Sequence, residues 1–181
     1  MLKFLLISGS PRKGNTEFIL DRIFKNIKSS EKEIVLLRKS KIEGCRGCLY
    51  CGKNNRCAIK DGMKEIYNKV RKAEILVIGT PNYFDSVSGL LKNFIDRTNP
   101  FYGDRDESGL KNKKIIFIVV GGGKIKNSKR VGETTLKYFS EAHEMKLIQT
   151  YYFQALEAGE TENNPKAIND IDKIIKKINS L

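Results

Sequence analysis

Four cysteines close together in the first third of the chain are the strongest candidates for metal or redox chemistry. They follow the spacing Cys-x2-Cys-x2-Cys-x5-Cys and are Cys45, Cys48, Cys51 and Cys57. Thiolates at every third position wrap a chain tightly around a bulky group, and the interleaved glycines let the chain turn. Bacterial ferredoxin runs open with the same spacing, so the pattern favours a single 4Fe–4S cluster held by all four sulfurs.

Two other uses of these thiols stay open on the sequence alone. One is a zinc site, although zinc sites more often pair two Cys-x2-Cys hooks that lie roughly a dozen or more residues apart. The other is a thiol or disulfide redox role. Structural disulfides are disfavoured, because the cysteines close no long loops and no secretory signal is evident. The lone histidine, His143, is expected to be an exposed helix residue and not a ligand.

The cysteines lie in a basic segment, residues 38–60, which holds seven Lys or Arg residues and one acidic residue. An iron–sulfur core with four thiolates is an anion, and the segment's cations can balance it; these are Arg46, Lys53, Arg56 and Lys60. The same patch can dock an acidic electron carrier, or can simply be a solvated basic surface. Because 25 of the 34 basic residues are lysine, no specific nucleic-acid reader is expected despite the net charge of +13.

The elements that must position these residues alternate between strand and helix patterns. Apolar runs predict strands at 3–8, 34–37, 75–80, 114–120 and 147–153. Apolar residues at helical spacing predict helices at 15–29, 61–72, 89–98, 131–145 and 165–181. Five buried strands separated by helices indicate an α/β fold, a doubly wound parallel sheet of order 2-1-3-4-5 with helices on both faces. We expect one domain over residues 1–181, with a cysteine-rich loop at about 38–60.

In such a sheet ligands bind beyond the carboxyl ends of strands one and three. The loop after strand one opens directly into a helix, and its candidate phosphate-binding residues are Ser8, Ser10, Arg12, Asn15 and Thr16. Helix amides, hydroxyl donors and a cation are what a terminal phosphate needs, whereas the ordinary alternative is a turn capped by Asn15 or Thr16. Asn15 occupies the place of the lysine that a nucleoside-triphosphate loop requires, and the dinucleotide pattern Gly-x-Gly-x-x-Gly is absent.

The loops after strands three and four offer contacts for a flat ring. The first contributes a stiff turn, an amide and two aromatic side chains, and its candidates are Pro81, Asn82, Tyr83 and Phe84. The second is the triplet Gly121, Gly122 and Gly123, which allows a ligand to approach the backbone closely. The aromatic side chains can instead pack the loop onto the core. Beside a phosphate site, these loops favour a phosphorylated ligand that carries a flat ring.

The chain resembles the flavodoxin-like FMN reductases, and the resemblance covers nearly its whole length. Three segments carry it: GSPRKGNT between strand and helix, TPNYFDSVSG leading into LKNFIDR, and VVGGG. The resemblance implies FMN, with its phosphate in the 10–16 loop and its ring against 81–84 and 121–123. Together with the cysteine spacing, the chain is similar to the iron–sulfur flavoproteins. That resemblance implies FMN with a 4Fe–4S cluster, and a homodimer or homotetramer in which one subunit's cluster faces a neighbour's flavin.

We therefore expect a cytoplasmic oxidoreductase that exchanges electrons between a carrier such as ferredoxin and an acceptor, with no catalytic side chain identified. One alternative is an NAD(P)H-dependent FMN or quinone reductase whose cysteine loop holds zinc or nothing. Another is a redox- or metal-sensing binding module. Neither a membrane partner nor secretion is expected, because no uncharged stretch is longer than residues 75–84, which are too few to span a bilayer, and no signal peptide is recognisable.

Overall fold

The protein is built on a six-stranded sheet in the computed structural model, which describes residues 2–103 and 109–181. Five parallel strands follow the order β2-β1-β3-β5-β6, and the short β4 pairs with β3 in antiparallel fashion. The strands are β1 Phe4–Ser8, β2 Lys32–Leu36, β3 Ile75–Tyr83, β4 Ser86–Val87, β5 Lys114–Gly121 and β6 Lys146–Gln154. With the β4 hairpin set aside, this is the predicted doubly wound order, which is confirmed.

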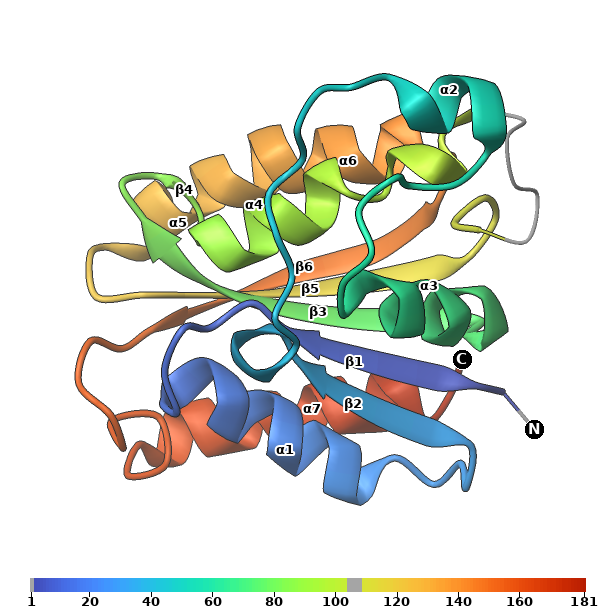
Figure 1. The fold of residues 1–181 in the computed structure, drawn as a ribbon. Helices are drawn as coiled ribbons and strands as arrows, with labels where there is room; N and C mark the ends of the chain where they lie inside the picture. The colour runs from blue at the N-terminus through green and yellow to red at the C-terminus, as the bar shows by residue number, and fades with distance from the viewer. Residues whose placement is uncertain (1, 104–108) are drawn as a thin grey trace.

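Helices cover both faces of the sheet (Figure 1). One face carries α1 Asn15–Asn26 and α7 Pro165–Ile178. The other carries α3 Met63–Lys72, α4 Gly89–Asp96, α5 Ile125–Val131 and α6 Lys137–Ala142. The π-helical turn Gly132–Leu136 joins α5 to α6. This continuous segment begins six residues earlier than the helix predicted over 131–145.

Side chains of the central strands alternate between two apolar cores. In β3, Leu76 and Ile78 pack under α3 and α4, while Ile75 and Val77 pack under α1 and α7. A strand buried on both faces needs apolar residues at every position, which explains the continuous apolar runs of the sequence. The two cores fix the sheet rigidly, and the loops at its carboxyl edge are positioned by it.

The exposed position expected for His143 was wrong. The residue is only 7% exposed, and its Nε2 lies 2.9 Å from the Thr98 hydroxyl. Its ring packs edge-on against the rings of Tyr102 and Phe139. His143 directly follows α6, and Phe139 lies four residues before it, a spacing that places both side chains on the inward-packing side of this segment. Burial holds the pKa of His143 below its ordinary value.

A buried ion pair fastens the end of α4 to the start of α3. The Arg97 side chain is completely buried, and its two terminal nitrogens donate to the Asp61 carboxylate at 2.8 and 2.9 Å. Arg97 also donates to the Glu43 carbonyl at 2.8 Å, and Asp61 accepts from the Glu43 amide at 2.8 Å. The pair therefore closes the base of the segment that carries the four cysteines.

We expect Asp61→Asn to lower the free energy of unfolding by about 3–5 kcal/mol, because it leaves the Arg97 charge buried without its counter-ion. Asp172→Asn is the matched control. It removes the carboxylate of the half-exposed pair with Arg22 and should cost less than about 1 kcal/mol. Urea denaturation of the two variants measures both values, and equal losses would contradict the assignment.

The same carboxylate predicts how stability depends on pH. Burial acts to raise the pKa of Asp61, but hydrogen bonds from Arg97 and from the amides of Glu43 and Met63 outweigh it and lower that pKa. The contribution of Asp61 is therefore present above its unfolded pKa of about 3.9, and it is lost as the pH falls through the lower folded value. Between these two values the wild type should lose more stability on acidification than Asp61→Asn does.

Candidate functional site

A small cavity of about 130 Å³ lies at the carboxyl edge of the sheet, among the loops that follow β1, β3, β5 and β6. Nine of the twelve residues predicted to bind the ligand line it, and they are Ser10, Arg12, Asn15, Thr16, Pro81, Asn82, Tyr83, Gly121 and Gly122. Residues from three loops far apart in the sequence thus converge on one place. The topology explains why, because parallel strands in neighbouring positions end at the same edge.

Three predicted residues lie outside this lining. Ser8 is fully buried at the end of β1, where its hydroxyl accepts a hydrogen bond from the Ser10 amide at 3.3 Å. Phe84 stands at the tip of the β3–β4 turn with a φ of 51° and a fully exposed side chain. Gly123 is exposed beyond the cavity. Of the two aromatic residues in this loop, only Tyr83 reaches the lining.

The start of α1 faces the cavity without a side-chain cap. Its first flanking residue, Gly14, has extended backbone and makes no capping hydrogen bond. The side chain of Asn15, which a simple capped turn would use, points elsewhere: its amide nitrogen donates to the Glu157 carbonyl at 2.7 Å, and its oxygen accepts from the Thr161 amide at 3.2 Å. Backbone amides at an uncapped helix start form a site for an anion.

A fourth loop, residues 155–161, completes the cavity and was missed by the sequence reasoning. Arg12 donates to the Leu156 carbonyl at 2.7 Å, and the Leu156 amide donates to Glu160 at 2.7 Å. The Leu156 side chain packs so closely on Gly122 that a Cβ there would lie 2.8 Å from it. The position of this loop directly after the fifth parallel strand was the only signal in the sequence.

Asn82 offers an unused acceptor within the lining. Its side-chain nitrogen donates to the Ser128 hydroxyl at 3.2 Å, whereas its Oδ1 is buried and has no partner among the described residues. An unpaired buried acceptor costs about 1–3 kcal/mol, so a donor on a ligand would remove that cost. Gly121 makes room for this contact, because a Cβ there would lie 2.6 Å from Ser128 Oγ.

These features suit the phosphate end of FMN together with one hydrogen-bond donor of a flat ring. The cavity is smaller than the roughly 300–1,000 Å³ of pockets that enclose a whole ligand. It would therefore hold only part of FMN, and the rest of the molecule would extend beyond it.

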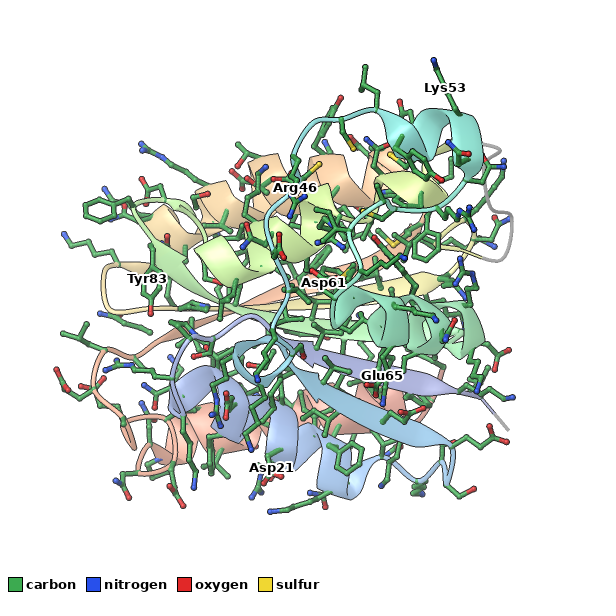
Figure 2. The ribbon with its side chains drawn as sticks, viewed as in Figure 1. Asp21, Arg46, Lys53, Asp61, Glu65 and Tyr83 are labelled. Atoms are coloured by element: carbon green, nitrogen blue, oxygen red, sulfur yellow. The ribbon has the colours of Figure 1, made fainter. Side chains whose placement is uncertain are left out.

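The cysteine loop leaves the same edge but travels away from the cavity. It turns at Leu37–Lys39, crosses α4, carries the short helix α2 Tyr50–Asn54 and returns to α3 (Figure 1). None of the residues between β2 and α3 in this loop lines the cavity, and the view in Figure 2 separates Tyr83 from Lys53 of α2.

The four thiols suit an iron–sulfur cluster in kind but are not arranged as one. All four are free, with Cys45 and Cys48 exposed and Cys51 and Cys57 partly buried. Within residues 2–103 and 109–181, no three Cys, His, Asp or Glu side chains are grouped closely enough to hold a metal ion. The spacing therefore identifies possible ligands, while the structure does not assemble them into a centre.

None of the helices in the described ranges has both the length and the apolar character that a membrane span needs.

Comparison with known proteins shows similarity over most of the chain. The family model for NADPH-dependent FMN reductase matches residues 2–160. An iron–sulfur flavoprotein of Archaeoglobus fulgidus is 42% identical over 99 residues, which are 54% of this chain and 49% of that protein. An iron–sulfur flavoprotein of Methanocaldococcus jannaschii is 34% identical over 141 residues, 75% of this chain and 68% of that protein. The chain thus spans about half the length of the first of these relatives.

Solved structures show the same fold at lower identity. A flavone reductase superposes with a TM-score of 0.75 at 21% identity, over 99% of this chain and 62% of that one. General stress protein 14 of Treponema denticola, solved in complex with FMN, superposes with a TM-score of 0.68 at 15% identity, over 97% of this chain and 99% of that one. These likenesses support the fold alone. The family match over residues 2–160, placed on the flavodoxin-like sheet described above, shows that the chain belongs to the NADPH-dependent FMN reductase family.

Proposed function

We propose that the protein is a flavin-dependent oxidoreductase that binds FMN at the cavity of the carboxyl edge. The observation that carries this proposal is the uncapped start of α1 beside Arg12, in a cavity that Asn82 also lines. Bound FMN supplies one- and two-electron redox chemistry, while the protein binds and orients it.

Different residues of the cavity bind the phosphate and the ring of FMN. The amides at the start of α1 and the Ser10 and Thr16 hydroxyls bind the phosphate, and Arg12 neutralises it. Asn82 Oδ1 accepts a hydrogen bond from the ring. Gly122 leaves space beside the ring once the Leu156 side chain moves from its present contact.

We further propose that Cys45, Cys48, Cys51 and Cys57 hold a 4Fe–4S cluster. The support is the spacing, the free state of all four thiols and the name iron–sulfur flavoprotein borne by relatives at 42% and 34% identity. Because the thiols are not gathered, loading requires the loop to close around the inorganic core. The cluster exchanges one electron at a time, whereas flavin exchanges one or two, so together they convert between the two modes.

The electron partner we propose is a ferredoxin-like carrier, and the assembly a homodimer or homotetramer. The basic loop offers a docking surface for an acidic carrier. Within one chain the cysteine loop contributes nothing to the cavity lining, which supports transfer to a neighbour's flavin. The charges of the two loops support this arrangement. The residues Glu157, Glu160 and Glu162 are exposed beside the cavity, and their negative charge complements the basic cysteine loop of a neighbour.

The second candidate is an NAD(P)H-dependent FMN or quinone reductase whose cysteine loop binds zinc or no metal. The family description and the ungathered thiols support it. This candidate uses the same FMN site, but no iron–sulfur cluster takes part in its reaction.

Arg12→Gln should weaken FMN binding about 10- to 100-fold, because a charge-assisted hydrogen bond to the phosphate contributes about 1.5–3 kcal/mol. Riboflavin is the matched ligand, since it carries the same ring without phosphate, and its affinity should not change. Fluorescence titration of the metal-free protein with each flavin measures both. If both flavins lose affinity equally, Arg12 does not bind the phosphate.

Anaerobically reconstituted wild-type protein should show the combined absorbance of flavin and cluster, with iron and sulfide in equal amounts. Cys51→Ser should abolish iron and sulfide binding and electron transfer from a reduced carrier while keeping FMN, because it removes one of the four proposed ligands. Leu49→Ser is the control, since it changes a neighbouring exposed side chain that is not a ligand.

The same variant separates the two candidate functions. If Cys51→Ser oxidises NADPH as fast as the wild type, and the wild type binds zinc or no metal after reconstitution, then the reductase without a cluster is correct. Loss of transfer together with loss of the cluster rules that candidate out.

A further inference from the structure

The base of the cysteine loop is held together by contacts between protein groups alone. Both backbone polar groups of Glu43 are engaged by one buried ion pair: its carbonyl accepts from Arg97, and its amide donates to Asp61, each at 2.8 Å. Asp61 also accepts from the Met63 amide at 3.0 Å. The chain entering the loop, the chain leaving it and the end of α4 therefore meet at one guanidinium.

A second contact tightens the same base. The backbone at Gly62 passes so close to Ser40 that a Cβ would lie 1.8 Å from the Ser40 carbonyl oxygen. No side chain can occupy that position without moving the backbone. Figure 2 shows Asp61 at this base, between α3 and the part of the cysteine loop that crosses α4.

Cys57 belongs to the fixed base. It is partly buried and packs against the core under α3 and α4. It lies four residues before Asp61 in the chain, and Tyr67 of α3 belongs to the same core. Tyr67 in turn donates to the Arg97 carbonyl. The Nε of Arg97 is buried and has no partner among the described residues, so this guanidinium keeps one unused donor.

The tip of the loop has a different character. Cys45 and Cys48 are exposed. Leu49 and Asn55 flank α2 with φ of 55° and 51°, a backbone conformation that favours glycine, and the Leu49 side chain is 75% exposed. None of the α2 residues is buried, and a segment with few buried contacts opens at a low free-energy cost.

We propose that Arg97 is a positioning residue of the metal site: it holds Cys57 in place through the base of the loop, and the other three thiols reach Cys57 when the tip closes. This inference rests on the proposed metal-binding role of the cysteines and adds an order of assembly. Polar partners around metal ligands orient them, and their loss commonly lowers metal affinity about 10- to 100-fold. The fixed base thus positions one thiol, and the tip of the loop brings the other three thiols to it.

Cobalt(II) tests the proposal in the metal-free protein, because thiolate-to-cobalt absorbance reports how many thiolates bind. The wild type should reach a band of four thiolates. Arg97→Met combined with Asp61→Asn, which leaves no unpaired buried charge, should bind cobalt about 10- to 100-fold more weakly and reach a band of three. Arg97→Lys should recover the four-thiolate band, because its ammonium group keeps the buried charge that pairs with Asp61 and can still donate to the Glu43 carbonyl.

Arg22→Met is the matched control, since it breaks a bidentate Arg–Asp pair between α1 and α7 that is remote from the loop, and it should bind cobalt as the wild type does. A double variant that also behaves like the wild type overturns the proposal. So does a Lys variant as impaired as the double variant. A wild type without any thiolate band overturns both this inference and the proposed metal role, whereas FMN binding stays a separate measurement.

Hydrogen exchange of the wild type tests the order of assembly without a variant. In the metal-free protein the amides of Glu43 and Met63 should exchange slowly, while those of residues 45–55 exchange fast and become protected only with cobalt. Equal protection of base and tip before cobalt is added overturns the proposal.

Discussion

Burial of the parallel strands on both faces is the constraint from which the site follows. Such strands need crossover connections, so β1, β3, β5 and β6 all end at one edge. At that edge β1 and β3 stay in contact, because Gly9 donates to the Gly79 carbonyl at 2.8 Å and a Cβ on Gly9 would lie 2.7 Å from the Cβ of Leu91. The helix α1 begins shortly beyond β1, and its first residues line the cavity where the loops diverge. A cavity lined by backbone donors is the consequence.

The part of the structure that could be predicted is the part encoded by local pattern. Continuous apolar runs located the strands because a doubly buried strand tolerates no other residues. The residues of three loops could be assigned to one site because they directly follow strands whose order the pattern fixes. The contribution of Leu156 could not be predicted, because its contact with Arg12 joins residues 144 apart and uses a backbone carbonyl, which any residue provides. The burial of His143 depends similarly on how α6 packs against Thr98 and Tyr102.

The cysteine loop shows a different limit of sequence reasoning. Spacing identifies which side chains can bind a metal, because ligand chemistry depends on residue type. It says nothing of whether they are assembled beforehand, since that depends on what holds the backbone. Here Asp61 and Arg97 lie 36 residues apart and meet only because the end of α4 packs beside the start of α3. This tertiary contact holds the base of the loop, whereas the conformation of the tip is determined by local interactions.

Electron transfer between the two proposed cofactors imposes a geometric condition on the assembly. No residue of the cysteine loop lines the cavity of its own chain, and the proposed homodimer or homotetramer would bring a neighbour's loop to it. Residues 38–60 carry seven basic residues and one acidic residue, and two such loops repel one another. In the proposed assembly the exposed acids Glu157, Glu160 and Glu162, which follow the cavity residue Leu156, would attract the basic loop of a neighbour instead. Complementary charge thus favours a pairing of loop with cavity over a pairing of loop with loop. An acidic carrier would then compete for the same cations, so it can dock only on the part of the basic surface that the neighbour leaves exposed.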